Sequence, residues 1–190
     1  MNIFSHKIEA TLKQMEEYER SYASVFAVDG ATGELLYKKV LEIKPKSVLE
    51  LGTWRGASAI YLAAALQVLG EGKVITLDKS LANIEKAKAN IAAAGLDAFV
   101  ECRLQDADKF LRKEKNLFGF VFIDAAKAEY GKWVEAIFSA HLAPEGIVIL
   151  DDVSTMSEKM ADLFSVLSKH PEIKATHHAI GNGLLELRRD

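Results

Sequence analysis

The chain has 190 residues, 49% of them hydrophobic, and a formal net charge of −3. This length and composition are typical of one globular domain with a sizeable core, and the pI near 6.0 gives no overall basic footprint for nucleic acid. No apolar run approaches the roughly 20 residues that span a bilayer, and the first residues lack the apolar centre of a signal peptide. The single cysteine, Cys102, excludes an internal disulfide. We therefore expect a cytoplasmic protein that binds neither membranes nor nucleic acid.

Two amphipathic helices are predicted before the first strand. Apolar residues from Ile3 to Phe26 recur every three to four positions, which predicts one long helix. The stretch "TGELLYKKVLEI" predicts a second helix, with Thr32 as a possible N-cap and Pro45 as its stop. These helices would occupy residues 1–44, ahead of a sheet core at residues 45–190 of the same single domain.

Strand and helix patterns alternate after Pro45. Strands are predicted at "SVLEL", "KVITLD", "AFVECRL", "FGFVFID" and "GIVILDD", with helices between them. The tail "IKATHHAIGNGLLELRR" predicts two more strands joined at "GNG". Alternating units with continuous Val/Ile/Leu strands predict an α/β, Rossmann-like doubly wound fold. We therefore expect a mainly parallel seven-stranded sheet with a C-terminal antiparallel hairpin.

Acidic residues follow all five of the core strands. They are Glu50, Asp78, Asp106 with Asp108, Asp124, and Asp151 with Asp152. In such a sheet, ligands bind beyond the carboxyl ends of the strands, near the switch in strand order. One polar strand end is ordinary, whereas acids at all five ends predict a ligand site along that edge.

The turn "ELGTWRGAS" opens the first helix of the sheet core. Gly52 and Gly56 are four residues apart, so the turn matches neither GxGxxG nor the phosphate loop that ends in Gly-Lys-Ser/Thr. A glycine turn at a helix start lets backbone N–H groups approach a ligand. Asp78, after the next strand, can accept hydrogen bonds from ribose hydroxyls. Together with Glu50, this pattern predicts a nucleoside ligand without phosphates, and S-adenosylmethionine is the main candidate.

The segment "VLELGTWRGASAIYLA" resembles the first motif of class I S-adenosylmethionine-dependent methyltransferases. The segment "FVFIDAAKAEYGKWVEAIFSAHLAPEGIVILDDV" and the tail "IGNGLLELRR" resemble the metal-dependent catechol and caffeoyl-CoA O-methyltransferase family. The resemblance runs from about Gly33 to the C-terminus. It implies a divalent-metal-dependent O-methyltransferase, expected as a homodimer, whose acceptor is a small vicinal dihydroxy aromatic.

The resemblance also implies roles for individual residues. Asp124, Asp151 and Asp152 match the positions that hold Mg²⁺ or another divalent cation, a role that suits hard oxygen ligands. Lys127 matches the general base, and a nearby cation with partial desolvation should lower its pKa. The positions that match the methyl-donor site are Glu50, Gly52, Trp54, Gly56, Ser58, Asp78, Lys79, Asp106, Ala107, Asp108 and Asp124. Either Asp106 or Asp108 should lie near the adenine. Tyr130 and Trp133 are interpreted as packing residues.

The sequence departs from the family pattern at Asp152, where the family usually has Asn, and at Gln105 and Ala126. Its N-terminal region, which in the family helps to shape the substrate pocket and dimer contacts, is also shorter than usual. Two alternatives stay open. One is a methyltransferase of the same fold that acts without a metal or on a hydroxylated tRNA base. The other is a non-catalytic or nicotinamide-binding module, against which the missing GxGxxG motif and the residues Asp124, Lys127, Asp151 and Asp152 count.

Overall fold

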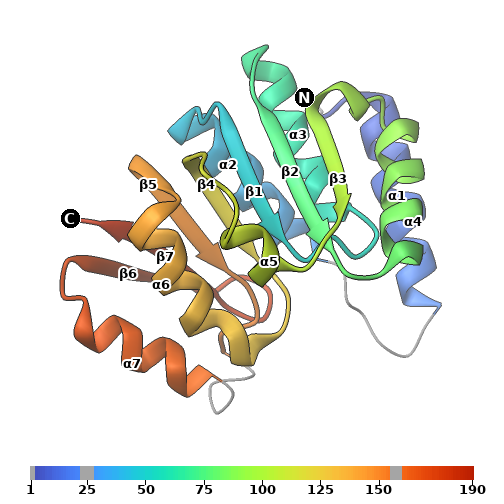
Figure 1. Ribbon diagram of the computed structural model, residues 1–190. Coiled ribbons are helices and arrows are strands. Elements are labelled where there is room, and N and C mark those ends of the chain that lie inside the picture. The colour runs from blue at the N-terminus through green and yellow to red at the C-terminus, as the bar shows by residue number, and fades with distance from the viewer. Residues whose placement is uncertain (1–2, 22–27, 155–159) are drawn as a thin grey trace.

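The computed structural model describes residues 3–21, 28–154 and 160–190. Within these residues, seven strands form one twisted sheet in the order β3-β2-β1-β4-β5-β7-β6 (Figure 1). The strands are β1 Ser47–Leu51, β2 Lys73–Asp78, β3 Val100–Leu104, β4 Phe118–Ile123, β5 Leu142–Leu150, β6 Ile173–His178 and β7 Leu184–Arg189. Strands β1 to β5 pair in parallel, and β7 pairs antiparallel with both β5 and β6. The predicted doubly wound sheet with its C-terminal hairpin is therefore confirmed.

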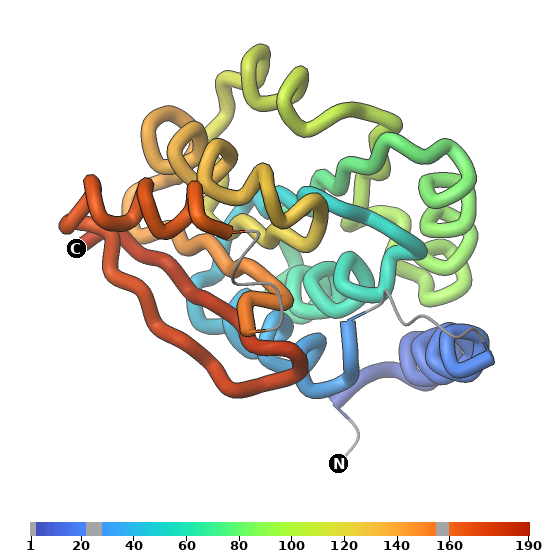
Figure 2. Tube along the Cα trace, turned by 90° about the horizontal axis from the view of Figure 1, so that it is seen from below, coloured from blue at the N-terminus to red at the C-terminus, as the bar shows by residue number. Residues whose placement is uncertain are grey.

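Helices cover both faces of the sheet. They are α1 His6–Arg20, α2 Gly30–Ile43, α3 Ala57–Leu69, α4 Leu81–Ala93, α5 Ala107–Leu111, α6 Tyr130–Ala140 and α7 Ala161–Lys169, with short 3-10 helices η1 Asp97–Phe99 and η2 Lys127–Glu129. Helices α1 to α4 share one apolar core with one face of the strands, and α5 to α7 share a second core with the opposite face. Figure 2 shows α1 and α2 across the sheet from α6 and α7.

Strand β4 shows why a central strand of the sheet is apolar on both faces. Phe120 and Phe122 lie in the first core, while Val121 and Ile123 lie in the second, and all four are fully buried. Because both faces of the strand are covered, both must be apolar. The first polar side chain after these four residues is Asp124, directly beyond the carboxyl end of the strand.

Several element ends differ from the predictions. The N-cap of α2 is Asp29, whose Oδ1 accepts a hydrogen bond from the N–H of Thr32 at 2.7 Å. Asp29 is favoured because a short carboxylate reaches the third N–H of the helix, so the prediction of Thr32 was wrong. Helix α1 runs only from His6, capped by Ser5, to Arg20. The later part of the long helix predicted there falls on residues 22–27, outside the described residues.

The strand order reverses at β1, which lies between β2 and β4. Two backbone hydrogen bonds hold the chain just beyond these strands: Gly52 N donates to the carbonyl of Leu77, and Asp124 N donates to the carbonyl of Leu51, both at 3.0 Å. The loops after β1 and β4 therefore diverge from one point, which is where α/β sheets bind their ligands.

Candidate active site

A cavity of about 780 Å³ opens at this point, a volume within the range of sites for drug-sized ligands. Its lining includes these residues of the predicted site: Gly52, Trp54, Asp78, Lys79, Asp106, Ala107, Asp124, Lys127, Asp151 and Asp152. Most of the predicted donor residues thus share one cavity with Lys127 and the predicted metal ligands. The lining also includes Val28, Asp29 and Thr32, before and at the start of α2, and Gly181 and Asn182, in the turn between β6 and β7.

Four of the predicted donor residues lie outside this lining. Glu50 and Ser58 are buried behind the glycine loop, and a Cβ on Gly56 would lie 3.2 Å from the methyl of Ala87. Asp108 turns away and accepts hydrogen bonds from Lys132 Nζ and Trp133 Nε1, both at 2.7 Å. Of the two acids expected near the adenine, only Asp106 lines the cavity, and Asp108 instead holds Trp133 in the wall.

The glycine loop contains three residues with positive φ, which are Gly52, Trp54 and Gly56. Gly52 has φ +102°, and a Cβ there would lie 2.0 Å from the carbonyl oxygen of Asp124. Trp54 has φ +45°, and its N–H donates to Asp78 Oδ2 at 3.0 Å. Its indole Nε1 donates to the buried Glu19 of α1 at 3.1 Å. The loop is therefore held at the sheet edge from β4, β2 and α1 together.

Asp78 organises the donor side of the cavity. Its carboxylate accepts hydrogen bonds from Trp54 N, Ser80 N and Asn83 Nδ2. A carboxylate has about four acceptor positions, so roughly one remains for a ligand hydroxyl. The carboxylate is thus fixed in place before any ligand binds.

Glu50 is the most deeply buried acid of the site. Its exposure is 0%, and neither carboxylate oxygen receives a hydrogen bond of ordinary geometry, although the hydroxyls of Ser58 and Thr76 lie close enough to offset part of the burial penalty. Burial therefore raises the pKa of Glu50 from 4.5 to about 7. An acid with a raised folded pKa favours folding while it is protonated, and that stability is lost as pH rises from about 4.5 through about 7.

Glu50→Gln is expected to stabilise the protein at alkaline pH. At pH 8 the variant should be more stable by ~2–3 kcal/mol, because it removes a buried charge, and the gain should fall below ~1 kcal/mol at pH 5. Urea unfolding at both pH values measures this. Glu71→Gln, at an exposed ion pair with Lys46, is the matched control and should show no such change. A gain for Glu50→Gln that is equal at both pH values would contradict the assignment.

Lys127 is the centre of a charged cluster on the other side of the cavity. Its Nζ lies 2.8 Å from Asp124 Oδ1 and 3.2 Å from Asp152 Oδ2. It also donates to Tyr130 Oη at 2.8 Å. Tyr130 is fully buried and its hydroxyl donates to the backbone carbonyls of Ile123 and Asp151. Tyr130 is therefore buried, as expected for a packing residue, and it also supplies a polar contact to Lys127.

The carboxylates and Tyr130 act on the pKa of Lys127 in the direction opposite to the fall expected beside a cation. Burial by itself lowers that pKa, but the contacts with Tyr130 and Asp124 outweigh burial and raise the pKa above its usual value. Burial also raises the pKa of Asp124, against the opposing effect of Lys127. Asp151 lacks an ion-pair contact with Lys127 in the described residues, and burial and the charge of Asp124 raise its pKa to about 7. The amine expected to be a base is thus an ammonium in this conformation.

The predicted metal ligands meet at one place, yet they do not form a ligand cage. In the part of the chain that the structure describes, no group of three His, Cys, Asp or Glu side chains is arranged to hold a metal ion. Instead, the ammonium of Lys127 neutralises Asp124 and Asp152. Carboxylate oxygens from adjacent strand ends are nevertheless the donors that Mg²⁺ prefers. The chemistry of the donor set fits a divalent cation, provided that Lys127 gives up these contacts.

The turn of the C-terminal hairpin adds a residue that the sequence did not single out. Asn182 Nδ2 donates to Asp152 Oδ1 at 3.0 Å. The sequence signal "GNG" indicated only a turn, because the partner lies 30 residues away in the chain.

Elsewhere, burial raises the pKa of the Cys102 thiol to about 11, as expected for an inert cysteine. No helix among the described residues has the length and apolarity to cross a bilayer.

Comparison with known proteins gives the class of the chain. A family model described as a methyltransferase domain matches residues 49–153. A Dictyostelium discoideum protein named probable caffeoyl-CoA O-methyltransferase 2 is 31% identical over 123 residues, which cover 62% of this chain and 52% of that protein. Catechol O-methyltransferase of Niastella koreensis is 26% identical over 165 residues, which cover 85% of this chain and 73% of that protein. The crystal structure of an SAH-bound Podospora anserina methyltransferase has a TM-score of 0.86 at 18% identity, over 98% of this chain and 89% of that chain.

The fold is that of the class I methyltransferases. Because the matched residues 49–153 make up more than half of its length, the chain belongs to the methyltransferase domain family. Its curated relatives include proteins named caffeoyl-CoA and catechol O-methyltransferases, the family that the sequence resembles. The matches span about half the length of the first of these curated relatives. The activity, acceptor and partners of the whole protein are therefore proposals.

Proposed function

We propose that the protein is an S-adenosylmethionine-dependent O-methyltransferase that uses Mg²⁺ or another divalent cation and methylates a small vicinal dihydroxy aromatic. The observation that carries this proposal is a single cavity with a donor side around Gly52 and Asp78 and a charged side around Lys127. We further propose that it works in the cytoplasm as a homodimer and without nucleic acid.

The donor side fits a nucleoside without phosphates. Gly52 lets the backbone approach the ligand, Asp78 offers about one free acceptor position to a ribose hydroxyl, and Asp106 lies in the wall expected to face the base. Bound S-adenosylmethionine would supply an electrophilic methyl group on sulfur. The protein would contribute position above all, since holding two reactants in line removes most of the entropic barrier to a bimolecular transfer.

The charged side fits the acceptor hydroxyl. Asp124, Asp151 and Asp152 would hold the cation, which would lower the pKa of the acceptor hydroxyl and orient it. Lys127 would take the hydroxyl proton at Nζ, and for this it must first lose its own proton and its contact with the carboxylates. Tyr130 keeps the lysine aimed at the cavity through its hydrogen bond to Nζ. The same residues thus offer a resting ion pair and a working base.

Calorimetric titration with S-adenosylhomocysteine tests the donor side. The wild type should bind one equivalent, and Asp78→Ala should bind ~5- to 150-fold more weakly, the equivalent of ~1–3 kcal/mol for unpaired hydrogen-bonding groups. Asn83→Ala is the control, because it removes one internal partner of Asp78 and leaves the carboxylate. Unchanged affinity in Asp78→Ala would overturn the assignment of this residue as a ligand contact. Equal losses in both variants would mean that Asp78 supports binding only by holding the surrounding backbone in place.

A further inference from the structure

Asp152 adopts a backbone conformation that a non-glycine residue rarely adopts. Its φ is +59°, and such left-handed residues persist only where their surroundings over-determine them. Its N–H donates to Asp151 Oδ1 at 2.7 Å, and its two carboxylate oxygens contact Asn182 Nδ2 and Lys127 Nζ. Asn182 thus fixes one oxygen while the other faces the lysine.

The hairpin turn also holds the backbone that follows Asp152. Val153 N donates to the carbonyl of Gly183, and Ser154 N donates to the carbonyl of Asn182, both at 3.0 Å. Gly183 has φ +88°, and a Cβ there would lie 2.0 Å from Ser154 Oγ. The turn and the segment after β5 are therefore in close contact through main-chain atoms, so that the position of one sets the position of the other.

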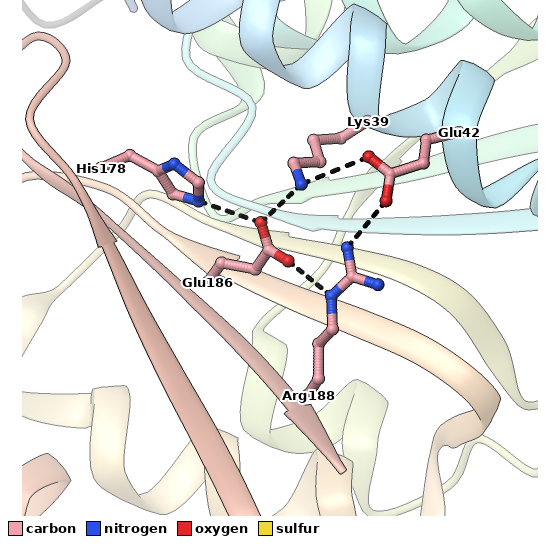
Figure 3. Close-up of polar contacts among 5 residues, drawn as sticks. All are labelled: Lys39, Glu42, His178, Glu186 and Arg188. Atoms are coloured by element: carbon pink, nitrogen blue, oxygen red, sulfur yellow. Dashed lines mark hydrogen bonds and ion pairs between the residues drawn. The ribbon is translucent and has the colours of Figure 1, made fainter. Parts of the chain in front are cut away.

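The strands of the hairpin are themselves anchored to α2. Glu186 of β7 has a side-chain exposure of only 5% and contacts Lys39 Nζ at 3.0 Å, His178 Nε2 at 3.0 Å and Arg188 Nε at 2.5 Å (Figure 3). Glu42 of α2 then contacts both Lys39 and Arg188. The hairpin also approaches α2 at its turn, beside the cavity, where a Cβ on Gly181 would lie 2.8 Å from Thr32 Oγ1. The hairpin thus contacts α2 at the Glu186 and Arg188 ion pairs and again at its turn, which lies beside Asp152.

We propose that Asn182 is a positioning residue, through which the C-terminal hairpin sets the orientation of Asp152 toward Lys127 and the cation. This inference rests on the proposed function. Removing the amide leaves Asp152 Oδ1 without its partner in the described residues and frees a strained backbone to relax. The carboxylate then has to be ordered each time a cation binds, which weakens binding.

The test compares Asn182→Ala with Ser154→Ala. Ser154 Oγ contacts His177 Nε2 at 3.1 Å, so this control removes a hydrogen bond between the same two segments without touching Asp152. Asn182→Ala should weaken Mg²⁺ binding, measured by calorimetry, by at least about tenfold, the lower end for the loss of a ligand's hydrogen-bond partner. Its melting temperature and S-adenosylhomocysteine affinity should match those of the control. In an Asp152→Ala background, Asn182→Ala should add little further loss, because the two residues act together.

Three outcomes would overturn the inference: Mg²⁺ affinity unchanged in Asn182→Ala, an equal loss in Ser154→Ala, or additive losses in the double variant. If Asn182→Ala does not fold, Asn182→Leu keeps a similar side-chain volume, lacks the hydrogen-bond donor to Asp152 and should lose the same Mg²⁺ affinity. A wild type that binds S-adenosylhomocysteine but no cation would overturn the inference as well, because Asn182 would then have no cation site to order. A wild type that does not bind S-adenosylhomocysteine would instead overturn the proposed function.

Discussion

Lys127→Met is expected to fold, to bind S-adenosylhomocysteine like the wild type, and to lose methyl transfer to a catechol at neutral pH by ~10²–10⁴-fold, the usual cost of removing a general base. Methionine keeps the apolar stem of the buried side chain but cannot accept a proton. Because the contacts with Tyr130 and Asp124 raise the pKa of Lys127, the wild-type rate at limiting cation should rise toward alkaline pH. Initial rates between pH 6 and pH 10 measure both effects.

A neighbouring lysine provides the control for this variant. Lys132 lies on α6, pairs with Asp108 and Glu129, and is about half exposed. Lys132→Met should therefore keep near-normal turnover. High pH should restore part of the activity of Lys127→Met, since hydroxide can take over proton removal. Near-normal turnover of Lys127→Met at pH 7 would reduce Lys127 to a counter-charge for the two carboxylates.

Gly52→Ala is expected to destroy the donor side of the cavity. The new Cβ would lie 2.0 Å from the carbonyl oxygen of Asp124, and the residue would have to keep φ +102°. The left-handed backbone alone costs a non-glycine residue ~1–2 kcal/mol, and relief of the clash must push the loop away from β4 at a further ~1–3 kcal/mol. We expect the unfolding free energy to fall by ~2–5 kcal/mol and S-adenosylhomocysteine affinity to fall at least ~100-fold, measured by urea unfolding and calorimetry.

Gly70→Ala separates the cost of the left-handed backbone from the cost of the steric clash. Gly70 ends α3 with φ +76°, but nothing lies within 4 Å of a Cβ placed there. This control carries the left-handed strain without the clash, so it should lose only ~1–2 kcal/mol of stability and keep its donor affinity. If Gly52→Ala bound S-adenosylhomocysteine as well as Gly70→Ala did, the loop would not be the donor site.

The sheet could be predicted because its signals are local in sequence. The core strands after Pro45 are continuous apolar runs, and the helices between them carry local end signals, such as Gly70, which supplies the left-handed end of α3. The acids at the strand ends could also be predicted to converge, since parallel strands bring their carboxyl ends to one edge. Asp78, Asp124 and Asp151 accordingly line one cavity.

Contacts between distant segments could not be predicted in the same way. The pKa of Lys127 depends on whether carboxylates or a cation lie beside its amine, and the spacing of residues in the sequence does not give that. The bond between Asn182 and Asp152 joins a turn to a strand end 30 residues away. Asp106 and Asp108 have the same chemistry and near-identical positions in the sequence, and it is the hydrogen bonds from Lys132 and Trp133 to Asp108 that turn this residue away from the cavity.

Transfer of a labelled methyl group from S-adenosylmethionine to a panel of catechols, with Mg²⁺ or after exhaustive chelation, tests the central claim most directly. The account predicts methylation of one hydroxyl of a vicinal pair, dependence on the cation, and no labelling of tRNA offered in parallel. Activity that survives chelation would remove the cation from the mechanism and leave the carboxylates as partners of Lys127. Labelling of tRNA but of no catechol, or no methyl transfer at all, would contradict the proposed function.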